Sequence, residues 1–565
     1  MTERCLNLME KTLSAYSDEY INEYFNRVQK EGLTEPGLPT LVANIGILIA
    51  HGRRHDLLPL FLEMMEFCCK TIPLGKAEND FSVSEIACCI MELEKANFVN
   101  KKDIARWKNY LKTIEVKRCY NKYAEKPTDF VLNWGLFTCL SEYCRQKIGV
   151  ANTEEFVDIQ IPTQLRWLDA NGMYKDNAAY DRHQPIIYDL VARYLFSFLL
   201  FSGYRGKFYK EIDYNLRKAG LLTLDMQSVS GEVGFGGRSN QFVHNEPILA
   251  IVFEYEARRY KEEGNLELAK KFKTAADRAL KFVEKQLSKT PITHVKNRFP
   301  RDSGFGCEEY AYFDKYMIAT ASKLYLVGTI CDESIPTEEY VQKPIVWHTT
   351  SFFHKTFVNS CGYTLEFDTN SEPNEDASGL GRIHKDGAPS TICLSTPFPV
   401  DNYVNFCGNE NKRQFSICAA VKDENGDWVL GADSDTKYTF VNSKCEKNSA
   451  SVAYKCTLVN GEEVLFTCSV DENGVLITAT GDENKEIGVA LAVFEFDGST
   501  HTKPTYGKEN ILIEYEDWVC EHVVKDGYEK LENFANRNGI YKGIVTSNKG
   551  KATALTKIYP KKLVC

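Results

Sequence analysis

The sequence predicts a two-domain α+β protein, an N-terminal (α/α)6 toroid followed by a C-terminal antiparallel β-sandwich. From residue 1 to about residue 330, apolar residues recur every three or four positions in amphipathic stretches. Beyond about residue 335, short runs rich in Val, Thr, Phe and Tyr alternate with polar residues. We therefore expect a helical domain at 1–335 and a sandwich at 344–565.

The helical part divides into about a dozen stretches of helix length. Short connections, many with Gly or Pro, separate most of them, which favours antiparallel hairpins. A dozen helices correspond to six hairpins closed into a toroid. An open helical solenoid is the alternative, because the sequence has no strict repeat. The predicted helices are 5–30, 36–52, 55–70, 82–95, 101–115, 129–148, 152–170, 185–203, 205–222, 246–263, 264–288 and 308–329.

The C-terminal part carries three Asn-Gly pairs, which are strong hairpin signals because both residues tolerate the backbone of a tight turn. They stand between runs that we expect to form strands at 428–430, 451–458, 463–470 and 475–480. This pattern, over roughly 220 residues, predicts a sandwich of antiparallel sheets. The pairs are Asn425-Gly426, Asn460-Gly461 and Asn473-Gly474.

Composition excludes several classes of protein. The net charge of −10 leaves no basic surplus to neutralise phosphates, so we expect no nucleic-acid partner. Charged residues fill the N-terminus where a signal peptide needs an apolar core, and the apolar runs are too short to span a bilayer. We expect a cytoplasmic protein that does not bind membranes; a homo-oligomer is compatible with the sequence.

The 19 cysteines are odd in number and scattered through apolar helices and strands. This distribution indicates buried free thiols in a reducing compartment rather than a disulfide framework. No Cys-x-x-Cys pair has a matching partner pair, so the sequence predicts no zinc ribbon. We expect no metal and no cofactor.

Three segments of similar design indicate a site. Polar clusters at 180–185 and 234–246 each precede a proline and an apolar helix, and a third lies at 304–316, each about sixty residues from the next. We expect Pro247 in the first turn of its helix, where its missing N–H does no harm. Our hypothesis is that successive hairpins bring the three segments to one cleft. The alternative is that each is only a helix cap.

Several residues of these segments suit particular chemistry. His183 and His244 could transfer protons near neutral pH, or could cap helices. Arg238 could grip a carboxylate with its planar fork, or could hold its own loop. Glu246 and Glu308 could form the acid and base of glycoside hydrolysis, or could complement helix dipoles.

Further candidates are aromatic or polar. Tyr188 and Tyr312 could donate a proton to a leaving oxygen, and Trp134 could form a sugar platform or belong to the core. Arg382 and His384 alternate onto one strand face and could reach the cleft; a solvated face is the alternative. The remaining substrate-binding candidates are Gln184, Asn240 and Asn245.

The order of domains resembles the toroid-and-sandwich carbohydrate-active enzymes, which include heparinase-type, alginate-lyase-type and chondroitin-lyase-type enzymes and some toroidal glucuronidases. In sequence, the resemblance rests on the segments 238–246, 309–317 and 382–384. It implies that an Asn or Arg neutralises a uronate carboxylate while a His and a Tyr exchange protons. Asn240, Arg238, His244 and Tyr312 could fill these roles. The usual Asn-His order is reversed here, as His244-Asn245.

The predicted function is cleavage of a glycosidic bond at a uronic acid in an oligosaccharide, by β-elimination. A helix N-terminus and an arginine both favour the substrate carboxylate. Two alternatives stay open: a hydrolase of β-glucuronidase type that uses Glu246, Asp189 or Glu308, and a non-catalytic carbohydrate-binding protein.

Overall fold

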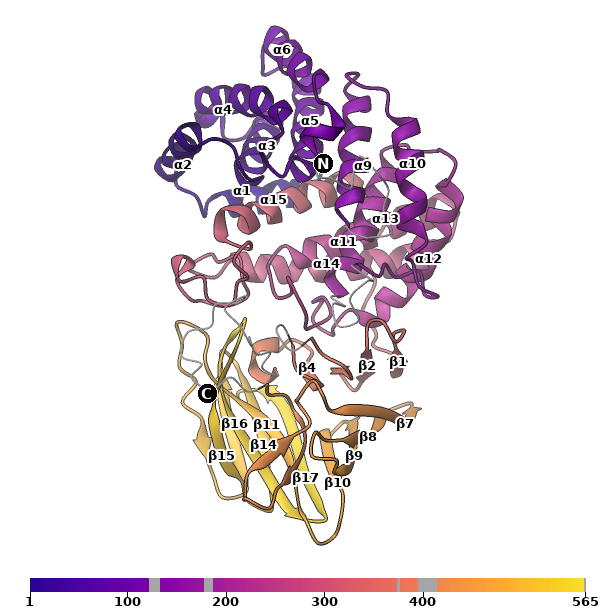
Figure 1. Ribbon diagram of the computed structural model, residues 1–565, viewed down its shortest axis with the longest axis vertical. Helices are drawn as coiled ribbons and strands as arrows, with labels where there is room; N and C mark the ends of the chain where they lie inside the picture. The colour runs from indigo at the N-terminus through magenta and orange to yellow at the C-terminus, as the bar shows by residue number, and fades with distance from the viewer. Residues whose placement is uncertain (121–132, 177–185, 373–375, 395–413, 563–565) are drawn as a thin grey trace.

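The computed structural model describes residues 1–120, 133–176, 186–372, 376–394 and 414–562. In these ranges, α-helices fill the N-terminal region and three antiparallel sheets fill the C-terminal region, which confirms the predicted fold class (Figure 1). The last helix ends at Ile330 and the first strand begins at Ile345.

The helices pack as neighbours in sequence and close into a ring. The first helix, α1, lies against the last, α15, and the Tyr16 hydroxyl donates to the Phe313 carbonyl oxygen at 3.3 Å. The helices are α1 (Glu3–Leu13), α2 (Asp18–Glu31), α3 (Gly37–Ala50), α4 (Leu58–Thr71), α5 (Asn79–Ala96), α6 (Lys101–Lys112), α7 (Val116–Cys119), α9 (Trp134–Lys147), α10 (Glu154–Leu165), α11 (Ile186–Phe201), α12 (Tyr209–Met226), α13 (Asn245–Glu262), α14 (Leu266–Leu287) and α15 (Phe313–Ile330).

Several predicted helices differ from the structure in their bounds, among them the stretches 5–30 and 308–329. The stretch 5–30 is two helices, because Ser17 caps a new helix by accepting a hydrogen bond from the Tyr20 N–H. The predicted helix 308–329 begins only at Phe313. Gly304 and Gly306 have positive φ, and the turns that follow them leave Glu308 in a loop.

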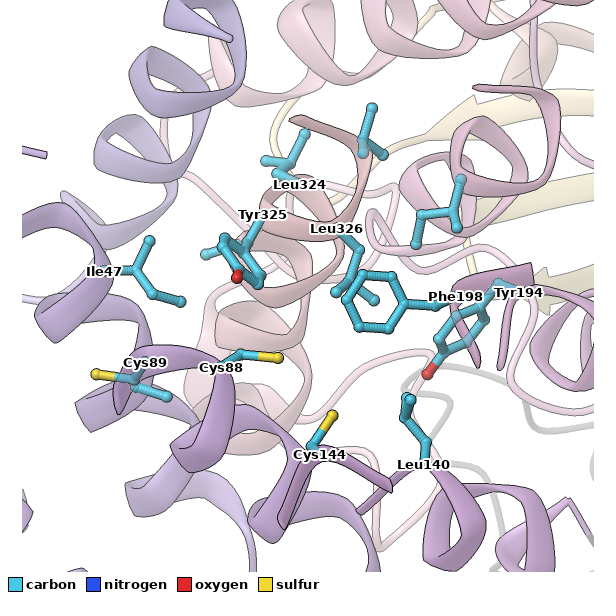
Figure 2. Packing of buried hydrophobic residues seen from close by; sticks show 14 of the residues in the cluster. Ile47, Cys88, Cys89, Leu140, Cys144, Tyr194, Phe198, Leu324, Tyr325 and Leu326 are labelled. Carbon is cyan, nitrogen blue, oxygen red and sulfur yellow. The ribbon is translucent and has the colours of Figure 1, made fainter. Parts of the chain in front are cut away.

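The core of the helical domain is formed by apolar side chains of several helices. Figure 2 shows Ile47 of α3, Leu140 of α9, Phe198 of α11 and Leu326 of α15 converging on one another. Each such side chain stabilises the fold by about 1.5–3 kcal/mol through burial. Every described cysteine is a free thiol and most are buried, as the sequence predicts.

The strands form three sheets, and all their pairings are antiparallel. The first sheet has the order β1 (Ile345–His348), β2 (Lys355–Ser360), β3 (Tyr363–Asp368), β4 (Gly379–Lys385). The second has the order β12 (Thr505–Tyr506), β13 (Asn510–Tyr515), β14 (Trp518–Val523), β17 (Lys551–Pro560), β10 (Gly474–Thr480), β9 (Glu463–Asp471), β8 (Ser449–Thr457), β7 (Lys437–Glu446). The third has the order β15 (Glu529–Asn536), β16 (Gly539–Lys549), β11 (Glu486–Phe496), β5 (Cys418–Lys422), β6 (Trp428–Leu430).

The three Asn-Gly pairs lie in the hairpins β5–β6, β8–β9 and β9–β10, where their glycines have positive φ. No described helix is long and apolar enough to cross a membrane.

Candidate functional site

A cavity of about 350 Å³ in the helical domain receives side chains from the second and third predicted segments and from the helix that follows the first. The second segment contributes Arg238 and His244, and the third contributes Tyr310 and Tyr316. Tyr188 belongs to α11, just after the first segment, which lies outside the described residues. The other lining residues are Pro36, Thr40, Glu78, Phe81, Glu85, Asn133, Trp134, Phe137, Ile187, Val191, Tyr194, Ser239, Ile248, Lys315, Ala319 and Lys323.

The loop that carries Arg238 has an unusual backbone. Gly236 has a φ of 96°, and a Cβ there would meet the Asp376 carboxylate at 2.0 Å, so the site requires glycine. Ser239 and Gln241 have φ of 56° and 64°, a region that non-glycine residues rarely adopt. Each costs about 1–3 kcal/mol, and such residues cluster at functional sites.

Arg238, Tyr310, Ser239 and Tyr188 are joined in that order by hydrogen bonds. Arg238 Nε donates to the Tyr310 hydroxyl at 2.7 Å. The Ser239 hydroxyl lies 2.8 Å from the Tyr310 hydroxyl and 3.0 Å from that of Tyr188. Burial raises the pKa of Tyr188 and of Tyr310 above the ordinary value, although Arg238 opposes the shift. Both phenols are therefore protonated at neutral pH.

His244 is at the N-cap position of α13 and lines the same cavity. Its Nδ1 is buried and has no hydrogen-bond partner among the described residues. Burial, followed by the positive charge of Lys323, lowers the pKa of His244 to about 3. The imidazole is neutral at pH 7 and keeps a lone pair for a proton. Its ring meets that of Tyr316 edge to face, with centroids 5.1 Å apart.

The sandwich supports this loop from outside the cavity. Glu308 accepts a hydrogen bond from the Ser239 N–H at 2.7 Å. Arg537, between β15 and β16, donates to both oxygens of the same carboxylate, at 2.6 and 2.8 Å. Both charged groups are buried, so removing one partner would leave an uncompensated charge. Glu308 thus does not line the cavity; it links the sandwich to the backbone of Ser239.

The carboxylates that suited hydrolysis lie elsewhere. Glu246 is fully buried and pairs with Lys296 at 2.6 Å. Asp189 is fully buried and pairs with Arg193 at 2.6 Å. Neither lines the cavity. Their place in the first turn of a helix did not distinguish a catalytic carboxylate from one that ends in an internal ion pair.

The expectation that the β4 residues reach the cleft is corrected by the structure. Arg382 and His384 do alternate onto one face of β4, but both are fully buried under the helical domain. Arg382 donates to Glu366 and to the Val233 carbonyl oxygen, while His384 lies 3.0 Å from the Ala388 carbonyl oxygen. They hold the chain that leads into the Arg238 loop.

The two predicted asparagines shape the same loop from within. Asn240 donates to the Gly234 carbonyl oxygen at 2.8 Å. Asn245 accepts from the Phe242 N–H at 2.9 Å and donates to the Ser239 carbonyl oxygen at 3.3 Å. Both are almost fully buried, so their amides are used by the protein itself.

Of the remaining candidates, Trp134 lines the cavity and also packs edge-on against Phe81, with ring centroids 5.4 Å apart. Tyr312 is 38 % exposed at the N-cap of α15 and is not among the lining residues. Burial, followed by the negative charge of Glu35, raises the pKa of Tyr312 above the ordinary value. His183 and Gln184 fall outside the described residues.

Sequence reasoning missed several lining residues. Tyr316 and Lys323 are seven positions apart on α15, and this helical spacing could have placed them on one face. Asn133 gave no such signal, because its position depends on Asp176, which is distant in sequence. The Asp176 carboxylate accepts hydrogen bonds from the backbone N–H of Asn133 at 2.8 Å and from its side-chain amide at 3.1 Å. Burial raises the pKa of Asp176 to about 7.

No protein-family model and no curated protein matches this sequence. Several solved structures are similar to the chain, among them the following three. A heparan sulfate lyase mutant from Pedobacter heparinus is 10% identical over 85% of this chain and 76% of its own, with a TM-score of 0.38. Heparinase III is 9% identical over 85% and 77%, with a TM-score of 0.37. A chondroitin lyase that is a baculovirus envelope protein is 9% identical over 93% and 76%, with a TM-score of 0.46.

Proposed function

We propose that this protein cleaves a glycosidic bond at a uronic acid residue of an oligosaccharide by β-elimination. The observation that supports it is the joint presence, in one cavity, of a guanidinium, protonated phenols and a neutral imidazole. β-Elimination requires these three functions: a group that neutralises a carboxylate, an acid and a base.

Arg238 is assigned to the uronate carboxylate. A guanidinium binds a carboxylate through two parallel hydrogen bonds, and neutralising that carboxylate acidifies the proton on the neighbouring C5. Arg238 also donates to Tyr310, so its position is fixed relative to the phenols.

His244 is assigned as the base and Tyr188 as the acid. The imidazole takes the C5 proton, the electron pair forms the C4–C5 double bond, and the bond from C4 to the leaving oxygen breaks. Tyr188 gives its proton to that oxygen. Ser239 lies between Tyr188 and Tyr310, so a proton can be replaced along the chain of hydroxyls. Arg238 would stabilise negative charge at the Tyr310 end.

The three carboxylates that the sequence offered for hydrolysis do not line the cavity, which supports elimination over hydrolysis by those residues. A hydrolase needs two carboxyl groups that flank the bond, one of them protonated. Glu246, Asp189 and Glu308 are each buried in an ion pair outside the cavity. Among the described lining residues, the carboxylates are Glu78, 2.7 Å from Lys315, and Glu85, 3.8 Å from Lys323.

The test is to incubate the protein with uronate oligosaccharides and record ultraviolet absorbance of unsaturated uronate beside the number of new reducing ends. Elimination yields both in equal amounts. Reducing ends without absorbance would show a hydrolase, and binding without either would show a carbohydrate-binding protein. A matched oligosaccharide whose carboxylates are reduced to alcohols should not react, because Arg238 has no partner on it and C5 is not acidified.

A further inference from the structure

In the sandwich, two thiols and an imidazole far apart in sequence meet in the core. Cys393 ends a short 3-10 helix (Ser390–Cys393), and Cys520 and His522 alternate onto one face of β14. Their sulfur and nitrogen atoms all lie within 4.8 Å of one another. Among the described residues this is the only such group of three or more His, Cys, Asp or Glu side chains. We propose that it binds one Zn²⁺ ion that cross-links β14 to the 3-10 helix.

The donor atoms suit zinc. Thiolate sulfur and imidazole nitrogen are its preferred protein ligands, with bonds of about 2.3 and 2.0–2.1 Å, so adjacent donors in a tetrahedron are roughly 3.5 Å apart. Cys520 Sγ lies 3.9 Å from His522 Nε2. The Ala492 carbonyl oxygen of β11 lies within hydrogen-bond distance of the same nitrogen, at 3.3 Å.

The environment fixes the imidazole for this role. His522 Nδ1 lies 2.9 Å from the Thr556 hydroxyl on the neighbouring strand β17. If Nδ1 carries the ring proton and donates it to that hydroxyl, Nε2 presents its lone pair to the metal. A hydrogen bond from the second ring nitrogen is the usual support of a zinc-bound histidine.

Charge balance also favours a zinc ion at this depth. The three side chains are fully buried, where an isolated dication would be costly. On binding, the two S–H bonds break, two Zn–S bonds form, and two protons leave to solvent, while zinc keeps its oxidation state. Two thiolates then cancel the dipositive charge. Because two ligands come from β14 and the third from the 3-10 helix, the metal would join elements distant in sequence.

The test uses the untagged full chain, unfolded in denaturant with a reductant and refolded with or without Zn²⁺. After removal of loose metal, elemental analysis should find about one zinc per chain. Cys520→Ser and His522→Gln should each lower this content at least tenfold, in line with lost ligands. Cys468→Ser is the matched control, since Cys468 is a fully buried thiol of the same sandwich, on β9. It should keep its zinc.

Wild-type protein refolded with Co²⁺ gives a readout that does not require a folded variant. A thiolate-to-cobalt charge-transfer band and an intense tetrahedral visible band are expected, and zinc should abolish both. Wild-type protein that refolds without bound zinc and shows no cobalt band overturns the proposal. A Cys393–Cys520 disulfide, seen as the loss of two hydrogen atoms and of two alkylatable thiols without reductant, also overturns it.

Discussion

Arg537 of the sandwich donates to both carboxylate oxygens of Glu308, and Glu308 in turn accepts from the backbone N–H of Ser239 beside the cavity. The pair spans 229 residues of sequence. It makes the geometry of the Arg238 loop depend on a domain that contributes no lining side chain among the described residues.

Arg537→Met should therefore destabilise the protein and lower turnover together. It leaves the Glu308 carboxylate buried and unpaired, which costs about 3–5 kcal/mol. Urea unfolding measures this loss. Lys271→Met is the matched control, because Lys271 pairs with Glu267 at 2.5 Å on an exposed helix face and such pairs contribute little to stability. Equal losses in the two variants would show that the buried pair is not what fixes the loop.

Gly236→Ala should lose more activity than the cost of placing an alanine at a positive φ would explain. The new Cβ would meet Asp376 at 2.0 Å and the Lys355 ammonium at 2.7 Å. Gly264→Ala is the comparison, because Gly264 also has positive φ, at 82°, but nothing lies within 4 Å of its Cβ position. That change should cost only the left-handed backbone penalty of about 1–2 kcal/mol and leave turnover intact. Similar turnover in both variants would mean that the loop tolerates displacement.

Arg238→Lys should lower kcat/KM on uronate substrates by about 10²–10³-fold, the usual loss for one removed electrostatic donor. A lysine ammonium cannot bind the carboxylate and the Tyr310 hydroxyl in the same planar arrangement. Arg258→Lys, in the last turns of α13 and outside the cavity lining, should leave turnover unchanged. Near-normal turnover of Arg238→Lys would remove the carboxylate clamp from the mechanism.

His244→Gln should lower kcat by about 10²–10⁴-fold, the range for a lost acid or base. Glutamine can hydrogen-bond at this position but does not titrate near neutrality. The circular dichroism spectrum should stay unchanged. Wild-type turnover in this variant would make the histidine structural and direct the search for the base to Tyr188 and Tyr316.

The pH dependence of stability should report the same histidine. Its folded pKa of about 3 lies below the ordinary 6.5, so between these values the unfolded chain binds one proton more than the folded one. Stability is therefore lost as pH falls below 6.5, by about 1.4 kcal/mol per unit. Between pH 7 and pH 5, His244→Gln should lose about 2 kcal/mol less than wild type.

Comparing the two proteins is necessary because other buried groups titrate in the same window. Burial raises the pKa of Asp176 and of Glu256 to about 7, and these groups contribute with the opposite sign. Their contributions cancel between wild type and variant. Parallel stability curves in urea at pH 7, 6 and 5 would contradict a buried neutral His244.

Much of the fold could be predicted because its signals are local. The hairpin glycines need positive φ, and a helix start tolerates Pro247, so α13 begins within one residue of its predicted start. The segments 234–246 and 304–316, which the sequence singled out, both contribute side chains to the candidate cavity, while the segment 180–185 lies outside the described residues. The roles of single residues were harder, because Glu246 and Glu308 look alike in sequence yet pair with Lys296 and Arg537.

The choice of tyrosine shows why helix boundaries matter. Apolar periodicity predicted a helix from residue 308, and Tyr312, which falls within it, was named as a candidate proton donor. Because α15 begins at Phe313, Tyr310 belongs to a loop and reaches the cavity, while Tyr312 is on the surface. Likewise, alternation placed Arg382 and His384 on one face of β4, but it does not specify what covers that face.

The most direct test of elimination is to follow the C5 hydrogen of a uronate disaccharide that carries deuterium at that position. The account predicts that wild-type protein releases the deuterium to solvent, forms a product with a C4–C5 double bond, and turns over the labelled substrate more slowly than the unlabelled one whenever proton removal limits the rate. A saturated uronic acid product that retains its deuterium would contradict it.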